Sequence, residues 1–206
     1  MKLPYELLEF YQRIKSDIEK ILEEYANVPK AKYFYELCYC ILTPQSSAKN
    51  AFLVQEKLEL HDFFNTDFDT KELLSSAEHY IRFHNQKANR LREVKEIFPD
   101  VLQVLESANS AFDKRKNIYK LVNGVGLKES SHFLRNIGYR DLAIIDRHLL
   151  KNLLRCGVIE EIPKSITEKN YYDIEEKFIK FGNYIGISID HLDLLFWSYE
   201  TGFILK

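Results

Sequence analysis

The chain has 206 residues, of which 46% are hydrophobic and 29% are charged, and its formal net charge is −2. This length and composition are ordinary for a folded globular protein, and the length fits one domain or two small lobes that share a cleft. No stretch approaches the roughly 18 uninterrupted apolar residues of a membrane span, and the N-terminus lacks the apolar core of a signal peptide. The sequence therefore argues against a membrane protein and against a secreted one.

The sequence predicts an all-α fold, because glycine and proline are few and apolar residues recur at helical spacing. A long opening helix runs through Leu7 to Leu22. Ser46 or Ser47 is a candidate helix cap, and Pro99 is expected near a bend or break. Further helices are predicted, in chain order, over residues 30–42, 47–60, 70–82, 86–106, 110–121, 128–137, 147–155, 168–186 and 189–200.

Metal and cofactor chemistry is not expected. The three cysteines, Cys38, Cys40 and Cys156, show no CxxC spacing, which is unlike a structural zinc or iron–sulfur site. The six histidines are scattered without a ligand pattern such as HExxH. The sequence therefore predicts free thiols in a reducing cytoplasm, no metal and no cofactor.

Positive charge is concentrated in one window of the chain. Residues 111–156 contain ten basic and four acidic side chains, a net charge of +6, whereas the rest of the chain sums to −8. Such asymmetry can mark a face that meets phosphate, or it can be a solvated helical surface.

The most informative stretch lies inside this window, at Asn123-Gly124-Val125-Gly126-Leu127-Lys128. A helix ends in a tight hairpin with two glycines around one apolar residue, and a second helix begins at once. Glycines permit positive φ and leave amide groups bare, while the new helix adds free N–H groups and the positive end of its dipole. We expect Val125 to anchor the hairpin in the core. The pattern predicts a helix–hairpin–helix contact with a DNA backbone, and the alternative is a plain glycine-rich link between packed helices.

Lys128 is a candidate nucleophile. A lysine in the first turn of a helix lies against the positive end of the dipole, which favours the neutral amine over the cation. An exposed solubilising lysine is the alternative.

Asp146 follows the apolar run Leu142-Ala143-Ile144-Ile145 and precedes another predicted helix, so it is a strong candidate N-cap. If Gly138 ends the helix that carries Lys128, the extended segment after it is long enough to bring Asp146 back beside that lysine. A neutral amine and a fixed carboxylate suit cleavage of an N-glycosidic bond, because the aspartate stabilises the oxocarbenium-like sugar and the amine forms a Schiff base. A simple lysine–aspartate salt bridge is the alternative.

These residues resemble the helix–hairpin–helix DNA glycosylase superfamily. The hairpin with Lys128 and the Ile145-Asp146-Arg147-His148 segment match its lysine and aspartate, and the whole chain is similar to the compact archaeal-type 8-oxoguanine DNA glycosylase/AP lyases. The resemblance implies the HhH-GPD fold, with two helical lobes around a cleft within one unit of 206 residues, and a helix–hairpin–helix at about 110–137. The chain lacks the four-cysteine cluster after the aspartate and the N-terminal β-sheet lobe of other relatives.

The resemblance also implies how DNA is bound. A flipped base is held in a pocket, where Trp197 is expected to stack on it, unless this tryptophan is simply core. Asp193, one turn earlier, either accepts hydrogen bonds from the base or is exposed. Lys206 at the C-terminus is also expected to contact the base, although it can instead belong to a frayed end. At the opposite wall of the pocket, the expected contact is either Phe83 or His84. The expected backbone contacts are Gly124, Val125, Gly126, Gln45 and Arg147.

The resemblance therefore implies a bifunctional enzyme that excises 8-oxoguanine from duplex DNA and nicks the strand by β-elimination. Two alternatives remain: a glycosylase of the same fold for another damaged base, and a non-catalytic DNA-binding module. Double-stranded DNA is the expected partner, with no membrane and no obligate protein partner, and the expected location is the cytoplasm, at the nucleoid.

Overall fold

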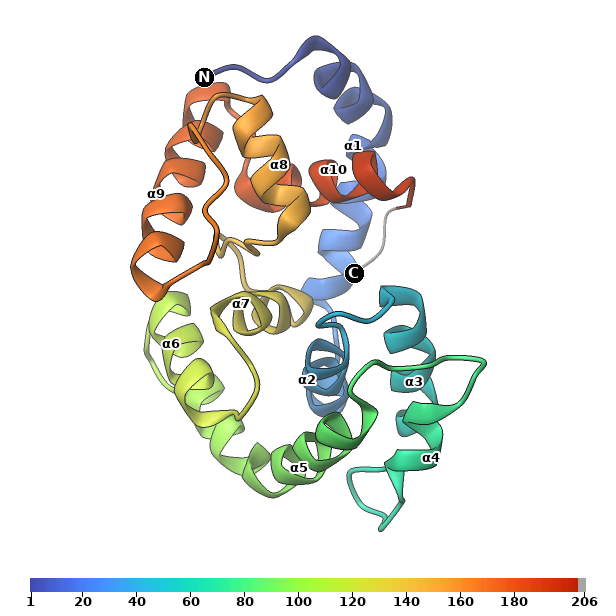
Figure 1. Ribbon diagram of the computed structural model, residues 1–206. Helices are drawn as coiled ribbons and strands as arrows, with labels where there is room; N and C mark the ends of the chain where they lie inside the picture. Colours follow the sequence, from blue (N-terminus) through green and yellow to red (C-terminus); the bar gives the residue numbers. More distant parts are fainter. Residues whose placement is uncertain (204–206) are drawn as a thin grey trace. The chain divides into compact units, whose positions relative to one another are not determined.

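The computed structural model describes residues 1–203, and every regular element in that range is helical (Figure 1). The predicted all-α class is therefore confirmed. The elements are α1 (Tyr5–Ala26), η1 (Lys30–Lys32), α2 (Tyr33–Leu42), α3 (Ala48–Leu60), α4 (Thr70–Ser75), α5 (His84–Glu106), α6 (Ala111–Leu121), α7 (Leu127–Asn136), α8 (Arg147–Arg155), α9 (Glu168–Ile185) and α10 (Ile189–Thr201). None of the helices within residues 1–203 combines the length and the apolar character needed to cross a lipid bilayer.

The chain forms two compact units. The terminal unit contains residues 1–27 and the chain from 134 onward, and the central unit contains residues 28–133. The boundary falls inside α7, so the first turns of this helix belong to the central unit and its last residues to the terminal unit.

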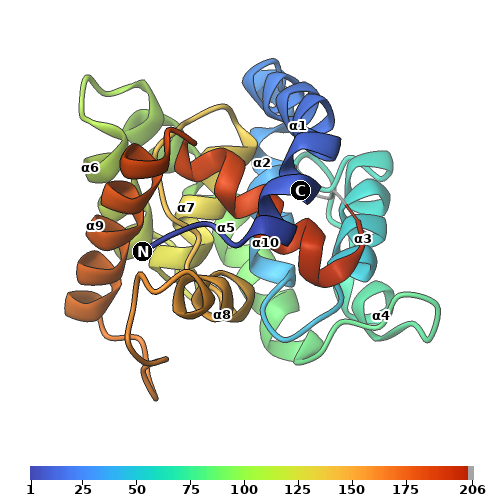
Figure 2. The same ribbon diagram turned by 90° about the horizontal axis from the view of Figure 1, so that it is seen from above.

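In the terminal unit, α10 is the central helix and packs against α1, α8 and α9 (Figures 1 and 2). Leu192, Leu195 and Phe196 are fully buried. A helix that is covered on several sides needs apolar residues around most of its circumference, which explains the apolar run in its second half. The neighbouring Tyr11 hydroxyl and His191 Nδ1 lie 3.0 Å apart and link α1 to the start of α10.

In the central unit, α2 supplies much of the core. Every residue from Phe34 to Leu42 is buried, and the helix packs against both α3 and α5. The long helix α5 in turn packs against α4 and α6. All three cysteines, two of them in α2, are buried, and none is in a disulfide, which agrees with the thiols that the sequence predicted.

Two expectations about helix boundaries need correction. The helix predicted over 70–82 ends at Ser75, because Ser76 has an extended backbone and Phe83 has a left-handed one, with φ 59°. The intervening turns are held by the hydrogen bond from the Ile81 amide to the Leu74 carbonyl, at 2.9 Å. Of the bend or break expected near Pro99, the break does not occur, since α5 continues through it to Glu106. Burial of the flanking residues on the packed face of α5 holds the helix there.

Candidate active site

The hairpin between α6 and α7 has the predicted form. Gly124 has a φ of +77°, a conformation that favours glycine. Val125 is 3% exposed and anchors the turn, with its amide bonded to the Val122 carbonyl at 3.2 Å. The second glycine has a different role from the one expected. Gly126 does not adopt positive φ, and a Cβ there would lie 2.9 Å from a carboxylate oxygen of Glu129.

Lys128 is the second residue of α7, as predicted, and its side chain is 30% exposed. Its Nζ lies 3.0 Å from Oε1 of Glu129, while Oε2 of Glu129 accepts a hydrogen bond from the Gly126 amide at 3.1 Å. The second contact is half of a capping box, in which a glutamate in the first turn reaches back to the residue before the helix. Glu129 therefore ties the lysine to the hairpin. Sequence reasoning missed this residue, although a glutamate at the third helical position was the available signal.

Lys87 is a second lysine in the central unit with an unusual environment. It is only 1% exposed, which is rare for lysine. Its ammonium group donates to the carbonyls of Leu42 and Pro44, both at 2.7 Å, and to Oγ of Ser46 at 3.1 Å. Burial, together with the nearby positive charge of Arg90, lowers the pKa of Lys87 to about 8. Lys87 thus fastens the end of α2 and the following loop to α5.

Lys87 should make stability depend on pH above neutrality. Its pKa is about 8 in the folded protein and 10.5 as an ordinary lysine, so the unfolded chain binds more protons between these values. Stability therefore rises with pH across that window, by up to about 3 kcal/mol. We expect the free energy of unfolding of the wild type, from urea titrations, to rise relative to that of Lys87→Met between these pH values. Lys95→Met is the control, because this lysine lies on the same helix with an exposed hydrogen bond to Thr66. Parallel pH profiles for wild type and Lys87→Met would contradict the expectation.

The loop held by Lys87 contains Gln45, whose φ of 57° is in the left-handed region. Ser46 Oγ also accepts a hydrogen bond from the Arg82 amide at 3.0 Å, so the same loop is fixed to the segment before α5. There Phe83 is 44% exposed, and the Arg82 guanidinium lies 5.0 Å from its ring centre. The His84 ring contacts the Tyr80 ring instead. Two predicted contact residues, Gln45 and Phe83, thus occupy strained backbone positions that their surroundings enforce.

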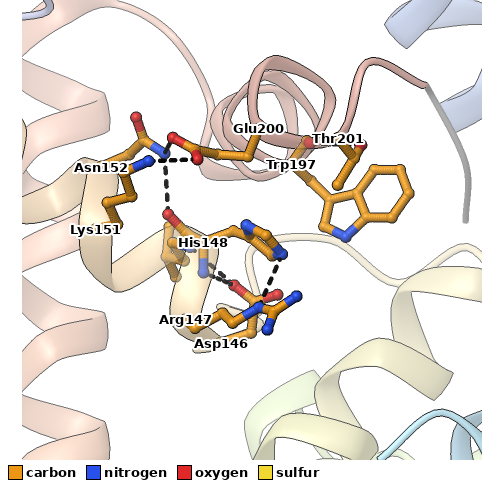
Figure 3. A network of polar contacts seen from close by, with 9 residues as sticks. Asp146, Arg147, His148, Lys151, Asn152, Trp197, Glu200 and Thr201 are labelled. Carbon is orange, nitrogen blue, oxygen red and sulfur yellow. Dashed lines mark hydrogen bonds and ion pairs between the residues drawn. The ribbon is translucent and has the colours of Figure 1, made fainter. Parts of the chain in front are cut away.

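In the terminal unit, Asp146 caps α8 as predicted (Figure 3). Its Oδ1 accepts hydrogen bonds from the amides of His148 and Leu149, at 2.9 and 2.8 Å. Its Oδ2 accepts no hydrogen bond from any residue in 1–203, so one carboxylate oxygen fixes the side chain and the other is left for a ligand. The preceding residues are buried and held by α9, through the Ala143 amide and Oε1 of Glu175, 2.9 Å apart.

The helix that carries Lys128 ends at Gly138, as predicted. Gly138, with φ +96°, ends α7, and its amide bonds to the Arg135 carbonyl at 3.0 Å. The Tyr139 amide bonds to the Leu134 carbonyl, also at 3.0 Å. These two bonds are the pair that defines a Schellman motif. The segment after it contains no helix until α8 begins.

Arg147 is exposed in the first turn of α8, as expected for a residue that meets a phosphate. Its Nε lies 3.2 Å from Nε2 of His148, so the two side chains form one polar surface next to Asp146 (Figure 3). On the far side of His148, the Lys151 ammonium and the Asn152 amide both bind Glu200 of α10. This network fixes α8 to α10.

Trp197 is partly exposed, whereas its neighbours Phe196 and Ser198 are buried. Figure 3 shows its indole projecting from α10 away from the contacts between Lys151 and Glu200. Trp197 is therefore not a fully buried core residue, and its stacking on a base stays a prediction.

The carboxylate of Asp193 is largely buried, which excludes the alternative that this residue is simply exposed. Its side chain is 13% exposed, and Oδ2 accepts a hydrogen bond from Arg135 at 2.5 Å. Burial, with smaller contributions from the carboxylates of Asp146 and Asp190, raises the pKa of Asp193 to about 7 against the opposing effect of Arg135. The guanidinium is therefore a partner of Asp193 that the sequence did not reveal.

The predicted site residues are divided between the two units. The hairpin, Lys128, Gln45, Phe83 and His84 belong to the central unit. The remaining ones within residues 1–203 belong to the terminal unit and are Asp146, Arg147, Asp193 and Trp197. Lys206 lies outside the described residues. The expected meeting of Lys128 and Asp146 stays a prediction. Within residues 1–203 no group of three or more His, Cys, Asp or Glu side chains is arranged to hold a metal ion.

An all-helical chain with a helix–hairpin–helix, a lysine in the first turn after the hairpin and an aspartate capping the next helix has the features of a DNA glycosylase of the helix–hairpin–helix class. The family model for 8-oxoguanine DNA glycosylase matches residues 14–187. The chain belongs to this family.

Relatives and a solved structure agree with this assignment over nearly the full chain. An 8-oxoguanine DNA glycosylase/AP lyase of Fusobacterium nucleatum is 36% identical, over 98% of this chain and 96% of the relative. The Methanocaldococcus jannaschii enzyme of the same name is 34% identical, over 94% of this chain and 93% of the relative. The crystal structure of the M. jannaschii 8-oxoguanine glycosylase/lyase in complex with a 15mer DNA containing 8-oxoguanine matches with a TM-score of 0.86 and 31% identity, covering 97% of this chain and 99% of that one.

Proposed function

We propose that this chain is a bifunctional 8-oxoguanine DNA glycosylase/AP lyase, which removes 8-oxoguanine from duplex DNA and then cleaves the strand at the abasic site. Membership of the family supports the lesion, and the names of the curated relatives support both activities. The observation that carries the proposal is the position of Lys128, in the first turn of α7 and joined through Glu129 to the hairpin. Phosphate binding alone requires no lysine there.

Lys128 is the nucleophile in this proposal. Its neutral amine attacks C1′ of the damaged nucleoside, the N-glycosidic bond breaks, and the base leaves with the bonding electron pair and takes up a proton. The aminated sugar then opens to a Schiff base. Loss of a proton from C2′ expels the 3′ phosphate by β-elimination, and hydrolysis of the Schiff base returns the free lysine. Glu129 positions the amine by holding it next to the hairpin that binds the DNA.

Asp146 supplies the negative charge. As the base departs, positive charge develops on the sugar, and a carboxylate fixed beside it lowers the energy of that state. The two backbone amides that donate to Oδ1 hold the side chain in place and prevent it from rotating away. The free Oδ2 is the oxygen that faces the sugar in this proposal.

DNA contacts are assigned as the sequence predicted. The hairpin of Gly124, Val125 and Gly126 contacts one phosphate, chiefly at Gly124, because the Val125 and Gly126 amides already donate to the Val122 carbonyl and to Glu129. Arg147 and Gln45 contact the backbone elsewhere. The flipped base stacks on Trp197 and on either Phe83 or His84, while Asp193 and Lys206 recognise its polar edge. Because the substrate is chromosomal DNA, the enzyme acts in the cytoplasm at the nucleoid, with no obligate protein partner.

The proposal is tested on a duplex with a single 8-oxoguanine opposite cytosine. We expect strand cleavage without alkali, from the combined activities, and more cleavage after hot alkali if excision outpaces β-elimination. A duplex with guanine at the same position should stay intact. Binding without cleavage of this duplex would refute the proposed lesion. Duplexes with an oxidised pyrimidine or an alkylated base would then separate a glycosylase of other specificity from a non-catalytic binding module.

A further inference from the structure

Arg90 of α5 lies directly against the hairpin, although it precedes the hairpin by more than thirty residues. A Cβ built on Gly124 would come within 2.3 Å of Nε, 2.4 Å of Cζ and 2.6 Å of Cδ of Arg90. These distances are far below the van der Waals contact distances of a Cβ atom. Two features therefore require glycine at position 124: its positive φ, and the Arg90 guanidinium, which occupies the space that a side chain would fill.

The Arg90 guanidinium makes no hydrogen bond or ion pair with any residue in 1–203, and it is partly exposed. Other arginines of the chain have partners: Arg92 binds the Asn89 side chain at 2.6 Å and Arg135 binds Asp193. A guanidinium carries five N–H donors in a planar fork that matches the oxygens of a phosphate. The Arg90 guanidinium therefore lies at the hairpin with no hydrogen-bond acceptor among residues 1–203.

Nearby charges favour an anion at this place. Both Arg90 and Lys128 lower the pKa of Lys87, which places three basic side chains within electrostatic reach of one another. Three carboxylates lie in the same region: Glu96, which lines the same pocket as Arg90, and Glu93 and Glu129, which are already engaged. Glu129 binds Lys128 and the Gly126 amide, and Glu93 accepts a hydrogen bond from Asn123 at 3.0 Å. The guanidinium is thus left for an external acceptor.

We propose that Arg90 is a phosphate-binding residue of the hairpin, donating side-chain N–H groups to a DNA backbone phosphate beside the one that the hairpin contacts. This inference rests on the DNA substrate of the proposed function and adds a contact that the hairpin sequence does not contain. A phosphodiester contact of this kind is independent of the lesion and of the base sequence. It also explains why the first glycine of the hairpin accommodates an arginine from another helix.

The test measures the affinity for an undamaged duplex by fluorescence anisotropy as a function of salt. One lost phosphate contact lowers the slope of log K against log salt by about 0.9. For Arg90→Gln, the affinity loss relative to wild type should therefore be about 3.5-fold larger at about 50 mM salt than at about 200 mM salt. Arg90→Lys keeps the charge and should keep the wild-type slope. Arg90→Met is a second neutral variant, which should match Arg90→Gln.

Arg92→Gln is the matched control, because it removes the same charge from the same helix two residues away, where the guanidinium is bound to Asn89. It should leave the slope unchanged. An unchanged slope in Arg90→Gln, or an equal change in Arg92→Gln, would overturn the inference. Binding to undamaged DNA is measured without any excision, so failure of this contact and failure of the proposed glycosylase activity give different results.

Discussion

Replacing Lys128 with glutamine is expected to reduce both excision of 8-oxoguanine and strand nicking by at least about 10⁴-fold, the scale on which loss of a covalent nucleophile acts. Glutamine cannot form a Schiff base, so neither step has a substitute nucleophile. It is long enough to fill the same space, and the hairpin that contacts phosphate is unchanged. Affinity for the duplex should therefore remain close to that of the wild type. Single-turnover cleavage, measured with excess enzyme, separates this loss of chemistry from a loss of binding.

Lys71→Gln is a closely matched control. Lys71 is also the second residue of a helix, α4, and is exposed next to a capping aspartate. Its replacement should leave excision and nicking unchanged. Retention of excision by Lys128→Gln would show that another group attacks the sugar, and Lys87, the buried lysine within electrostatic reach of Lys128, would be the next candidate.

Replacing Asp146 with asparagine should slow excision by about 10²- to 10³-fold, which is typical of the loss of one fixed charge or donor that stabilises a transition state. The substitution separates two roles of one side chain. Asparagine caps helices as well as aspartate does, so the bonds to the His148 and Leu149 amides and the melting temperature should be preserved. What is lost is the negative charge next to the developing oxocarbenium.

Two further variants make this interpretation specific. Asp146→Ala removes the cap as well as the charge, and should cost about 1 kcal/mol of stability in addition to the loss of activity. Asp69→Asn changes the capping aspartate of α4, which accepts a hydrogen bond from the Lys71 amide at 2.9 Å. This control should alter neither stability nor activity. If Asp146→Asn were as active as wild type, Asp146 would be only a helix cap, and the charge that stabilises the sugar would have to come from elsewhere.

Most of the helices could be predicted from the sequence because their signals are local. Apolar spacing located α6, α8 and α10 within a residue or two, and the cap at Asp146 and the stop at Gly138 follow from single residue types. The false extension of α4 to residue 82 has a physical cause. The apolar residues that suggested a helix there belong to turns fastened to other elements, such as the hydrogen bond from Asn50 to the Tyr80 carbonyl.

The candidate site was only partly predictable. The position of Lys128 in the first turn of α7, the cap at Asp146 and the anchoring role of Val125 could be predicted because each depends on its own neighbours in sequence. The roles of Lys87, Arg90 and Arg135 depend on contacts with residues far away along the chain. Lys87 meets a loop 41 to 45 residues earlier, and Arg135 meets Asp193 58 residues later. No local pattern distinguishes these residues from ordinary surface cations.

The most direct test of the central claim is borohydride reduction during the reaction of the wild-type enzyme with the duplex containing 8-oxoguanine. A Schiff base between enzyme and sugar is converted by reduction to a stable amine, which appears as a covalent protein–DNA adduct. The account predicts an adduct whose cross-linked peptide contains Lys128, and no adduct with Lys128→Gln. An adduct on a different lysine, or base excision with no trapped adduct at all, would contradict it.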